Sequence, residues 1–235
     1  MMEKHILLAS NSPRRRELLA WLGWPFTARA MNVDESQRPA EPALAYVARL
    51  AAEKAQAALP LIAAGELPPS CTVVAADTIV VDPLAAVGSP ESILGKPAGP
   101  DEARAMLRSL RGRVHIVCTA LAVIPAGQQD VRGDVCTSRV PMRTYGDAEM
   151  EAYIASGDPL DKAGAYAIQN GQFRPVSAEF AGCFASVTGL PLCHLARTLR
   201  GMGWATDADI PAACRQKLGY DCPIHAAVQR GEKVG

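Results

Sequence analysis

The 235-residue sequence has no excess of either charge, no long hydrophobic run, no low-complexity tract and no internal repeat. Lys plus Arg and Asp plus Glu both total 24, so the formal net charge is zero and the broad basic surface of a nucleic-acid-binding protein is not expected. No apolar stretch approaches the roughly 18 residues that span a bilayer, and the start of the chain lacks the apolar region and cleavage site of a signal peptide. We therefore expect a cytoplasmic protein without nucleic-acid or membrane partners.

The sequence also lacks the cysteine spacings that mark metal sites and disulfide frameworks. Its seven cysteines are an odd number without a C-x-x-C pair, and its four histidines do not cluster in sequence. Cys193 and His194 are adjacent, but neighbouring side chains point in different directions in a helix or strand. A zinc site or a set of disulfides is therefore not expected, and most thiols are predicted to be reduced core residues. A Cys–His nucleophilic pair stays open, although nothing in the spacing supports it.

Hydrophobic residues make up 49% of the chain and charged residues 20%, which is the balance of a globular enzyme. The length allows one large α/β domain or two small ones with an ample core. Hydrophobic periodicity predicts strands at 26–30, 73–81, 114–124 and 131–143. It also predicts helices at 100–110, at 147–156 and at 192–202. Asp147 is expected to cap the second of these helices, and the third is expected to be the last helix in the chain. From Thr206 the sequence turns polar and irregular. We expect one domain over residues 1–205 and a C-terminal tail or peripheral extension over 206–235.

The most informative segment lies near the N-terminus, where an apolar run at residues 6–9 is followed by two serines and three successive arginines. Ser12 suits the N-cap of a helix and Pro13 its first position. The arginines then fall in the first turn, where the helix dipole disfavours positive charge. A solvated basic helix start is one explanation. A bound phosphate explains more, because backbone N–H groups, hydroxyls and guanidinium groups would converge on one anion. The candidate phosphate ligands are Ser10, Ser12, Arg14 and Arg15.

Lys54 falls in the apolar arc of a helix predicted from Pro42 to about Leu59. A lysine at such a position either extends its ammonium group to the rim of the core or points into a polar cleft.

Asp77 is the one acid in the apolar run at 73–81. A carboxylate in apolar surroundings needs cations or hydrogen bonds, so Asp77 either turns a hairpin or takes part in chemistry. The β-branched residues on both sides argue against a turn.

Six short motifs, in register over about residues 5–203, resemble the Maf family of nucleoside triphosphate pyrophosphatases. They are LASNSPRR at 8–15, RLAAEKA at 49–55, ADT at 76–78, GKP at 95–97, KAGAYAIQ at 162–169 and GLP at 189–191. The resemblance implies a mixed α/β fold, in which a long curved sheet and its helices form two lobes around a central nucleotide-binding cleft. It also implies hydrolysis of a nucleoside triphosphate to monophosphate and pyrophosphate with Mg²⁺ or Mn²⁺, and it is compatible with a homodimer.

The resemblance gives Asp77 the role of catalytic base, and the needs of phosphoryl transfer suggest roles for the other candidate residues. Asp77 and Glu35 would hold the divalent cation, for which hard oxygen ligands are suited, although Glu35 could also be a solvated loop acid. Lys54 and Lys96 would meet the negative charge that develops on the phosphates. Lys162, in a glycine-rich segment that is neither a dinucleotide fingerprint nor a Walker loop, would bind substrate. The serines and arginines of the N-terminal turn would hold the triphosphate.

The same resemblance points to a pyrimidine substrate. In the family, Arg14, Thr78 and Gln169 match the type that acts on dTTP and UTP, whereas the 7-methyl-GTP type shows tryptophan, glutamine and glutamate. Gln169 offers a donor and an acceptor, as reading a pyrimidine edge requires. Two segments depart from the pattern: 172–184 lacks a second glycine pair, which affects the pocket behind Gln169, and 85–91 is elongated.

Three alternatives stay open at this stage: a modified pyrimidine triphosphate, 7-methyl-GTP, or a nucleotide-binding regulator of cell division that senses without hydrolysing. Asp77 together with the two lysines favours an enzyme, because a sensor needs affinity and has no use for a positioned base.

Overall fold

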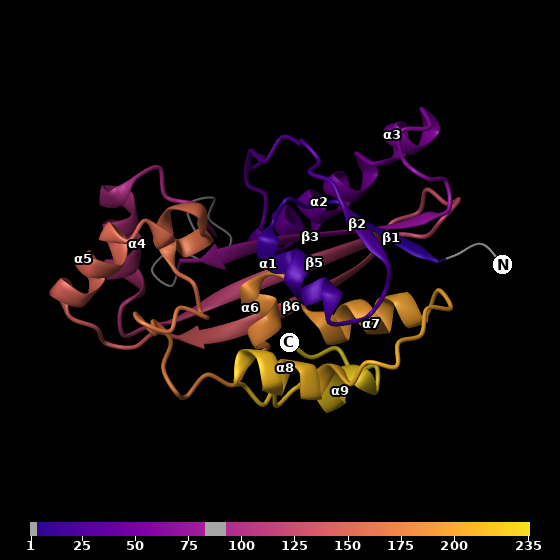
Figure 1. Ribbon diagram of the computed structural model, residues 1–235. Helices are drawn as coiled ribbons and strands as arrows, with labels where there is room; N and C mark the ends of the chain where they lie inside the picture. The colour runs from indigo at the N-terminus through magenta and orange to yellow at the C-terminus, as the bar shows by residue number, and fades with distance from the viewer. Residues whose placement is uncertain (1–3, 83–92) are drawn as a thin grey trace.

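The computed structural model describes residues 4–82 and 93–235, whose central feature is an open six-stranded mixed sheet (Figure 1). The strands are β1 (His5–Leu8), β2 (Phe26–Ala28), β3 (Cys71–Val81), β4 (Ile93–Leu94), β5 (Val114–Ile124) and β6 (Arg132–Pro141). The order across the sheet is β2-β1-β3-β5-β6, with β4 paired to the end of β3. β1 runs parallel to β2 and β3, whereas β5 is antiparallel to β3 and β6. The predicted mixed α/β class is confirmed.

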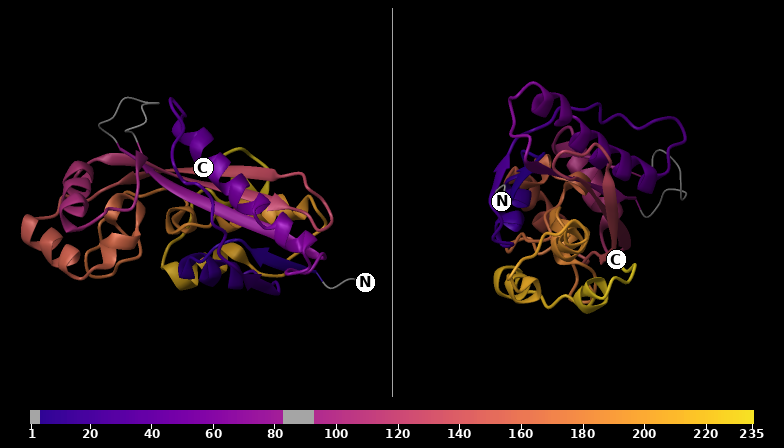
Figure 2. Two further views of the ribbon diagram at one scale, coloured as in Figure 1. Left: turned by 90° about the horizontal axis from the view of Figure 1, so that it is seen from above. Right: turned by 90° about the vertical axis from the view of Figure 1, so that its right-hand side faces the viewer.

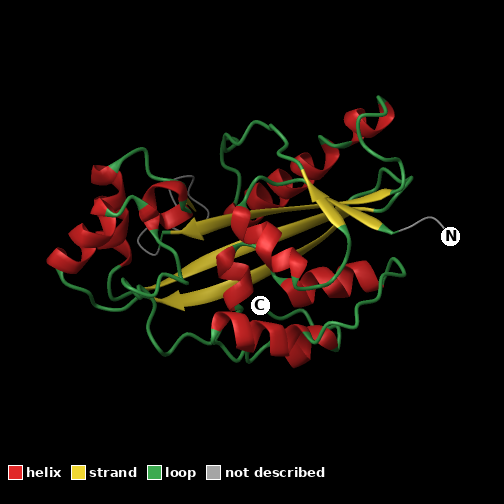
Figure 3. Cartoon of the chain, viewed as in Figure 1, coloured by secondary structure: helices red, strands yellow, loops and turns green. Residues whose placement is uncertain are grey.

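The long strand β3 has neighbours along only part of one edge (Figure 3). β1 pairs with residues 71–74, and β4 pairs with Val80 and Val81. Between them, no strand in the described part of the chain pairs with residues 75–79 on this edge, while β5 pairs with β3 continuously from Val73 to Val81 on the other. Asp77 lies in this gap in mid-strand, so it does not turn a hairpin.

Helices cover both faces of the sheet, as the views in Figure 2 show. One face packs against α2 (Ala43–Gln56), whose Val47 and Ala51 share a buried cluster with Val73 and Ala75 of β3. The other face packs against α1 (Pro13–Ala20), α6 (Phe184–Thr188) and α7 (Leu192–Arg200). Because side chains alternate along a strand, Asp77 belongs to the α2 face and Thr78 to the α1 face.

A second group of helices surrounds the far ends of β3, β5 and β6, away from α7 in Figure 1. It consists of α4 (Pro100–Leu110), α5 (Asp147–Ala155) and the short 3₁₀ turns η2 (Asp158–Asp161) and η3 (Ala163–Ala165). Their apolar side chains form one buried cluster with Val80, Val117 and Val140 of the sheet. The Tyr145 hydroxyl donates to the Leu107 carbonyl at 2.6 Å. This group corresponds to the second of the two lobes that the family resemblance implies.

Most predicted elements agree with the structure, with local corrections. Gly146 occupies the N-cap of α5, so Asp147 is its first helical residue and not its cap. The short helices α3 (Leu59–Ala63) and α6 were not predicted. The segment at 85–91, which is elongated relative to the family pattern, lies outside the described residues.

The helix at 192–200 is not the last one, because α8 (Ile210–Leu218) and α9 (His225–Gln229) follow it. The Asp209 carboxylate caps α8 by accepting from the Ala212 N–H at 3.1 Å. Ile210 and Val228 are buried, and the Thr206 hydroxyl donates to the Leu22 carbonyl at 2.8 Å. The sequence beyond Thr206 therefore contains two helices where we expected irregular chain.

All seven cysteines are free, and five of them are buried. Burial raises the pKa of Cys193 to about 12 and that of Cys214 to about 11, as expected for unreactive core thiols. His194 interacts with Cys136 and not with its sequence neighbour Cys193. Cys136 is fully buried, so this pair has no access to a substrate. Within residues 4–82 and 93–235 no group of three or more His, Cys, Asp or Glu could hold a metal ion, and no helix is long and apolar enough to cross a membrane.

The C-terminal helices yield a stability test. Ile210→Ala should lower the free energy of unfolding by about 2 kcal/mol, or roughly 4–8 °C in thermal midpoint, because it leaves a cavity between α8 and the core. Leu44→Ala on α2 is the matched control, since the Leu44 side chain is 53% exposed and its removal should change little. The measurement is thermal unfolding of both variants. An unchanged midpoint for Ile210→Ala would show that α8 does not pack as described.

Candidate active site

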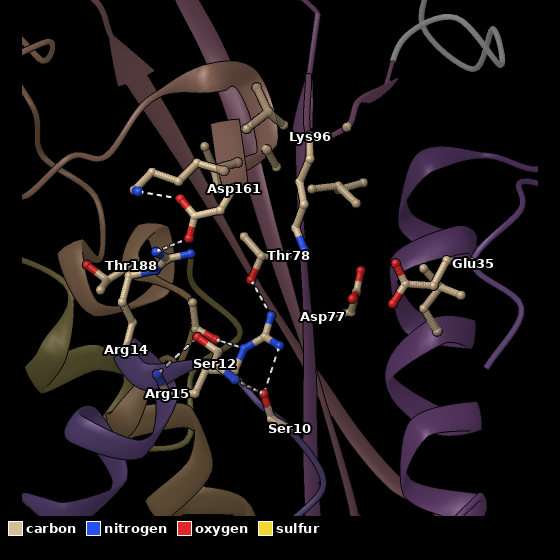
Figure 4. Close-up of a pocket in the computed structure, with 18 of the residues that line it drawn as sticks. Ser10, Ser12, Arg14, Arg15, Glu35, Asp77, Thr78, Lys96, Asp161 and Thr188 are labelled. Atoms are coloured by element: carbon tan, nitrogen blue, oxygen red, sulfur yellow. Dashed lines mark hydrogen bonds and ion pairs between the residues drawn. The ribbon is translucent and has the colours of Figure 1, made fainter. Parts of the chain in front are cut away.

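A cavity of about 660 Å³ opens at the unpaired edge of β3, between the two lobes (Figure 4). Every candidate residue from the sequence contributes to its wall. They are Ser10, Ser12, Arg14, Arg15, Glu35, Lys54, Asp77, Thr78, Lys96, Lys162 and Gln169. These residues come from the turn before α1, the first turn of α1, the loop before α2, α2 itself, β3 and two segments of the second lobe. The fold thus brings together residues that are more than 150 positions apart in the chain.

The turn between β1 and α1 has the geometry that its sequence predicts. Ser12 is the N-cap of α1, and its hydroxyl accepts from the Arg15 backbone N–H at 3.4 Å, with Pro13 at the first helical position. The Ser10 hydroxyl accepts from the Ser12 N–H at 3.2 Å. Arg14 and Arg15 line the cavity, whereas Arg16 does not line it and donates to the Asn11 carbonyl at 3.3 Å. Two of the three arginines therefore face the space where an anion would sit.

Arg15 is anchored to three different elements of the cavity wall. Its Nε donates to the Gly189 carbonyl at 2.9 Å, Nη1 to the Ser10 hydroxyl at 3.4 Å and Nη2 to the Thr78 hydroxyl at 3.2 Å. Burial lowers the pKa of this guanidinium, an effect that the charge of Asp77 opposes. Since a guanidinium has five N–H donors, Arg15 is held rigidly and still has donors to offer an anion.

Across the cavity, Lys54 joins two carboxylates. Its Nζ lies 2.6 Å from Asp77 Oδ1 and 2.6 Å from Glu35 Oε1, and the Lys54 and Asp77 side chains are only 12% and 11% exposed. Lys54 thus points into a polar cleft. Burial acts to raise the pKa of Glu35, but the hydrogen bond and charge of Lys54 outweigh it, so the pKa is lowered. Figure 4 shows Glu35 and Asp77 facing one another, opposite Ser10, Ser12 and Arg15.

The loop that carries Glu35 is fastened to α2. The Tyr46 hydroxyl donates to the Glu35 carbonyl at 2.7 Å, and Arg49 Nη2 donates to the Ser36 carbonyl at 3.0 Å. Arg49 also forms a bidentate pair with Glu41, at 2.6 and 2.7 Å. One helix therefore supplies Lys54 and holds the loop that presents Glu35 to it.

The second lobe contributes Lys96, Lys162 and Gln169. Lys96 is exposed at the mouth of the cavity, and Figure 4 shows it extending toward Asp77. Gln169 is exposed and lines the same cavity. Lys162 is buried, and its Nζ donates to the Asp158 carbonyl, the Asp158 carboxylate and the Asp161 carboxylate at 2.6, 2.9 and 2.6 Å. Three protein acceptors thus occupy Lys162, whose substrate-binding role stays a prediction.

Three wall or near-wall residues were missed from the sequence. Asp161 accepts from Lys162 and, at 3.5 Å, from Arg14 on the opposite lobe. Tyr46 anchors the Glu35 loop. Thr119 bonds to Thr78 across the strand pair β3–β5. Asp161 stands directly before a quoted motif and could have been singled out, but Tyr46 and Thr119 depend on strand register and loop path, for which the sequence holds no local signal.

The donor set suits a divalent cation of the magnesium type. Asp77 and Glu35 present carboxylate oxygens to one point, marked by the Lys54 ammonium 2.6 Å from each. Mg²⁺ is commonly held by one or two carboxylates and completes its shell with water and substrate phosphate. Two carboxylates opposite an anion-binding turn fit that mode better than a full protein cage.

Comparison with known proteins places this geometry in context. Residues 5–202 match the family described as Maf-like protein. The chain is 43% identical over 205 residues to a dTTP/UTP pyrophosphatase of Anaeromyxobacter dehalogenans, covering 86% of this chain and 96% of that protein. It is 41% identical over 200 residues to a dTTP/UTP pyrophosphatase of Hahella chejuensis, covering 85% and 93%. A dTTP/UTP pyrophosphatase of Methylococcus capsulatus is 42% identical over 207 residues, covering 86% and 92%.

The Arg49–Glu41 pair makes stability depend on pH. The hydrogen bond from Arg49 lowers the pKa of Glu41 from 4.5 to about 2. A lowered pKa in the folded state stabilises the fold fully above about pH 4.5, and this stabilisation is lost as the pH falls toward 2. Glu41→Gln should therefore lower the free energy of unfolding at pH 7, and its difference from wild type should shrink between pH 4.5 and 2.

Denaturant unfolding across this pH range measures the effect. Glu66→Gln is the control, because Glu66 pairs with Arg29 at the surface, where both side chains are about half exposed. A Glu41→Gln difference that stays constant over the whole range would show that the carboxylate does not titrate in contact with Arg49.

Proposed function

The chain belongs to the Maf family, and we propose that it hydrolyses dTTP and UTP to the nucleoside monophosphate and pyrophosphate. The observation that carries the proposal is the placement of Asp77, Glu35 and Lys54 directly across one cavity from the turn formed by Ser10, Ser12 and Arg15. Carboxylates and a phosphate-binding turn on opposite walls are what hydrolysis of a phosphoanhydride needs. The shared name of three relatives, each covered over nine-tenths or more of its length, favours a pyrimidine substrate over 7-methyl-GTP or a regulator without activity.

Triphosphate binding is the task of the turn before α1. The Ser10 and Ser12 hydroxyls, the remaining N–H donors of Arg15 and the guanidinium of Arg14 surround one region of the cavity. Negative charge there is favoured by the N-terminal end of α1 and by the desolvated Arg15. The contact of Arg14 with Asp161 is long, at 3.5 Å, and its partner is exposed, so a phosphate can displace it at little cost.

Bond cleavage requires an activated water and neutralised phosphates. Asp77, oriented by Lys54, accepts the proton as water attacks, and the bond between the α- and β-phosphates breaks to release pyrophosphate. Lys54 and Lys96 face the oxygens on which charge increases. Asp77 and Glu35 would hold Mg²⁺ or Mn²⁺, which supplies charge neutralisation and orients water. Positioning and electrostatics provide most of the rate enhancement in such phosphoryl transfers.

The nucleobase would lie toward Gln169 and Thr78, which the triphosphate contacts leave available. Gln169 offers both a donor and an acceptor and so matches the alternating edge of uracil or thymine. A glutamate at this position could only accept when ionised.

Asp77→Asn tests the mechanism. The change keeps the shape of the side chain but removes the charge and the proton acceptor, so kcat should fall by about 10²- to 10⁴-fold. Folding should survive, because Lys54 keeps its contact with Glu35. Pyrophosphate release and thermal unfolding are measured together. Asp134→Asn is the control, since Asp134 pairs with Arg197 and does not line the cavity. Near-normal turnover by Asp77→Asn would refute the mechanism.

A panel of dTTP, UTP, GTP, ATP and 7-methyl-GTP tests the substrate assignment. We expect kcat/KM for dTTP and UTP to exceed the purine values by roughly a hundredfold or more, because a wrong base leaves the hydrogen-bonding groups of Gln169 and Thr78 unpaired. Gln169→Glu should lower kcat/KM for dTTP about tenfold through loss of the amide donor and gain of a charge. Gln172→Glu adds the same charge at an exposed residue outside the cavity wall and should have little effect. A wild-type preference for 7-methyl-GTP would overturn the pyrimidine assignment but not the family.

A further inference from the structure

Two threonine hydroxyls form a short chain behind the cavity. Thr78 on β3 and Thr119 on β5 are directly opposite in the strand register, and their Oγ1 atoms are 3.0 Å apart. Thr119 is completely buried and also lies 2.8 Å from the Ser186 carbonyl oxygen of α6. Thr78 in turn lines the cavity and contacts Arg15 Nη2 at 3.2 Å. The hydrogen bonds therefore connect the backbone of α6, through Thr119, to the Thr78 hydroxyl, which a ligand in the cavity can reach.

The direction of each hydrogen bond follows from the two ends of this chain. A carbonyl oxygen can only accept, so the single proton of Thr119 is donated to Ser186. Thr119 then accepts from Thr78, whose own proton is spent in that bond. At the other end a guanidinium can only donate, so Arg15 donates to Thr78. Only this assignment allows both the Thr78–Thr119 bond and the bond from Thr119 to the Ser186 carbonyl. If Thr119 donated to Thr78 instead, its buried hydroxyl would have no proton left for the Ser186 carbonyl.

Thr78 consequently presents a lone pair, and no proton, to the cavity. Phosphate oxygens are acceptors and gain nothing from such a group. The partner that fits is a hydrogen-bond donor on the substrate. Uracil and thymine share one in the ring, the imide N3–H, whereas cytosine has a lone pair at N3 and would oppose that of Thr78.

We propose that Thr119 is a positioning residue for substrate specificity, which orients the Thr78 hydroxyl as an acceptor for the imide N–H of uracil and thymine and so disfavours cytosine. The inference rests on the proposed function and extends it to discrimination between pyrimidines. Thr119 touches no substrate; it acts through the proton of Thr78. The preference for uracil and thymine over cytosine comes from whether the Thr78 hydroxyl accepts or donates a hydrogen bond. The size and shape of the cavity do not determine this.

Thr119→Val tests this assignment, because valine has the shape of threonine but can neither accept from Thr78 nor donate to Ser186. The Thr78 proton is then released to rotate toward the cavity, where it can be donated to cytosine N3. We expect the ratio of kcat/KM for UTP to that for CTP to fall about tenfold or more. Thr119→Ser keeps the hydroxyl and should retain the wild-type ratio. Thermal unfolding of both variants accompanies the kinetics.

A second measurement needs no variant. The wild type should hydrolyse N3-methyl-UTP at least tenfold less efficiently than UTP, since the methyl group replaces the donor that Thr78 accepts. Wild-type enzyme that hydrolyses both nucleotides equally well overturns the inference, even if Thr119→Val fails to fold. An unchanged UTP-to-CTP ratio in folded Thr119→Val also overturns it, and would be the result if Thr78 accepted from a ribose hydroxyl, which both nucleotides share. In both cases turnover of UTP and dTTP by the wild type leaves the proposed function standing, whereas failure to hydrolyse either nucleotide refutes the proposed function itself.

Discussion

The gap in strand pairing along β3 is the constraint on which the site depends. β1 ends beside Val74 and β4 pairs only with Val80 and Val81, so five residues of a central strand have a neighbour on one side only, in the described part of the chain. Asp77 and Thr78 lie in that gap, held straight by the continuous pairing with β5. The rigidity of a sheet interior and the access of a sheet edge are thus combined at one place, and the cavity forms there.

Stability alone does not explain the ion pair of Lys54 with Asp77. Both side chains are about one-tenth exposed, and replacing a buried pair of this kind by apolar residues is often neutral or stabilising by about 1–4 kcal/mol. A second carboxylate, Glu35, at the same ammonium group adds a charge that a purely structural pair does not need. The cluster thus gathers two carboxylates and an ammonium group beside a cavity whose opposite wall is cationic.

Local patterns in the sequence were sufficient for the elements that depend on them. The N-cap Ser12, the first-turn Pro13 and the helix at 100–110 follow from capping chemistry and apolar periodicity, and the structure has each as predicted. The six motifs contain ten of the eleven candidate residues, and the structure places all eleven, Glu35 included, around one cavity. What failed depends on long-range packing. The amphipathic signal of α8 is weak, and its stability comes from burying Ile210 against a core formed by distant strands. Thr119 is one threonine among several until the register with β3 is known.

The alternation of side chains along β3 links the accuracy of folding to the chemistry. Asp77 and Thr78 are adjacent in sequence but project from opposite faces of the sheet, one toward Lys54 and the other toward Arg15. A slip of β3 by one residue against β5 would exchange the two faces, so that the carboxylate would meet the guanidinium and the hydroxyl would meet the ammonium. Such a misfolded sheet could retain much of its small apolar packing, because alanine and valine occupy both faces of the strand. Enzymatic turnover would therefore report an error in strand register that a measurement of secondary-structure content would overlook.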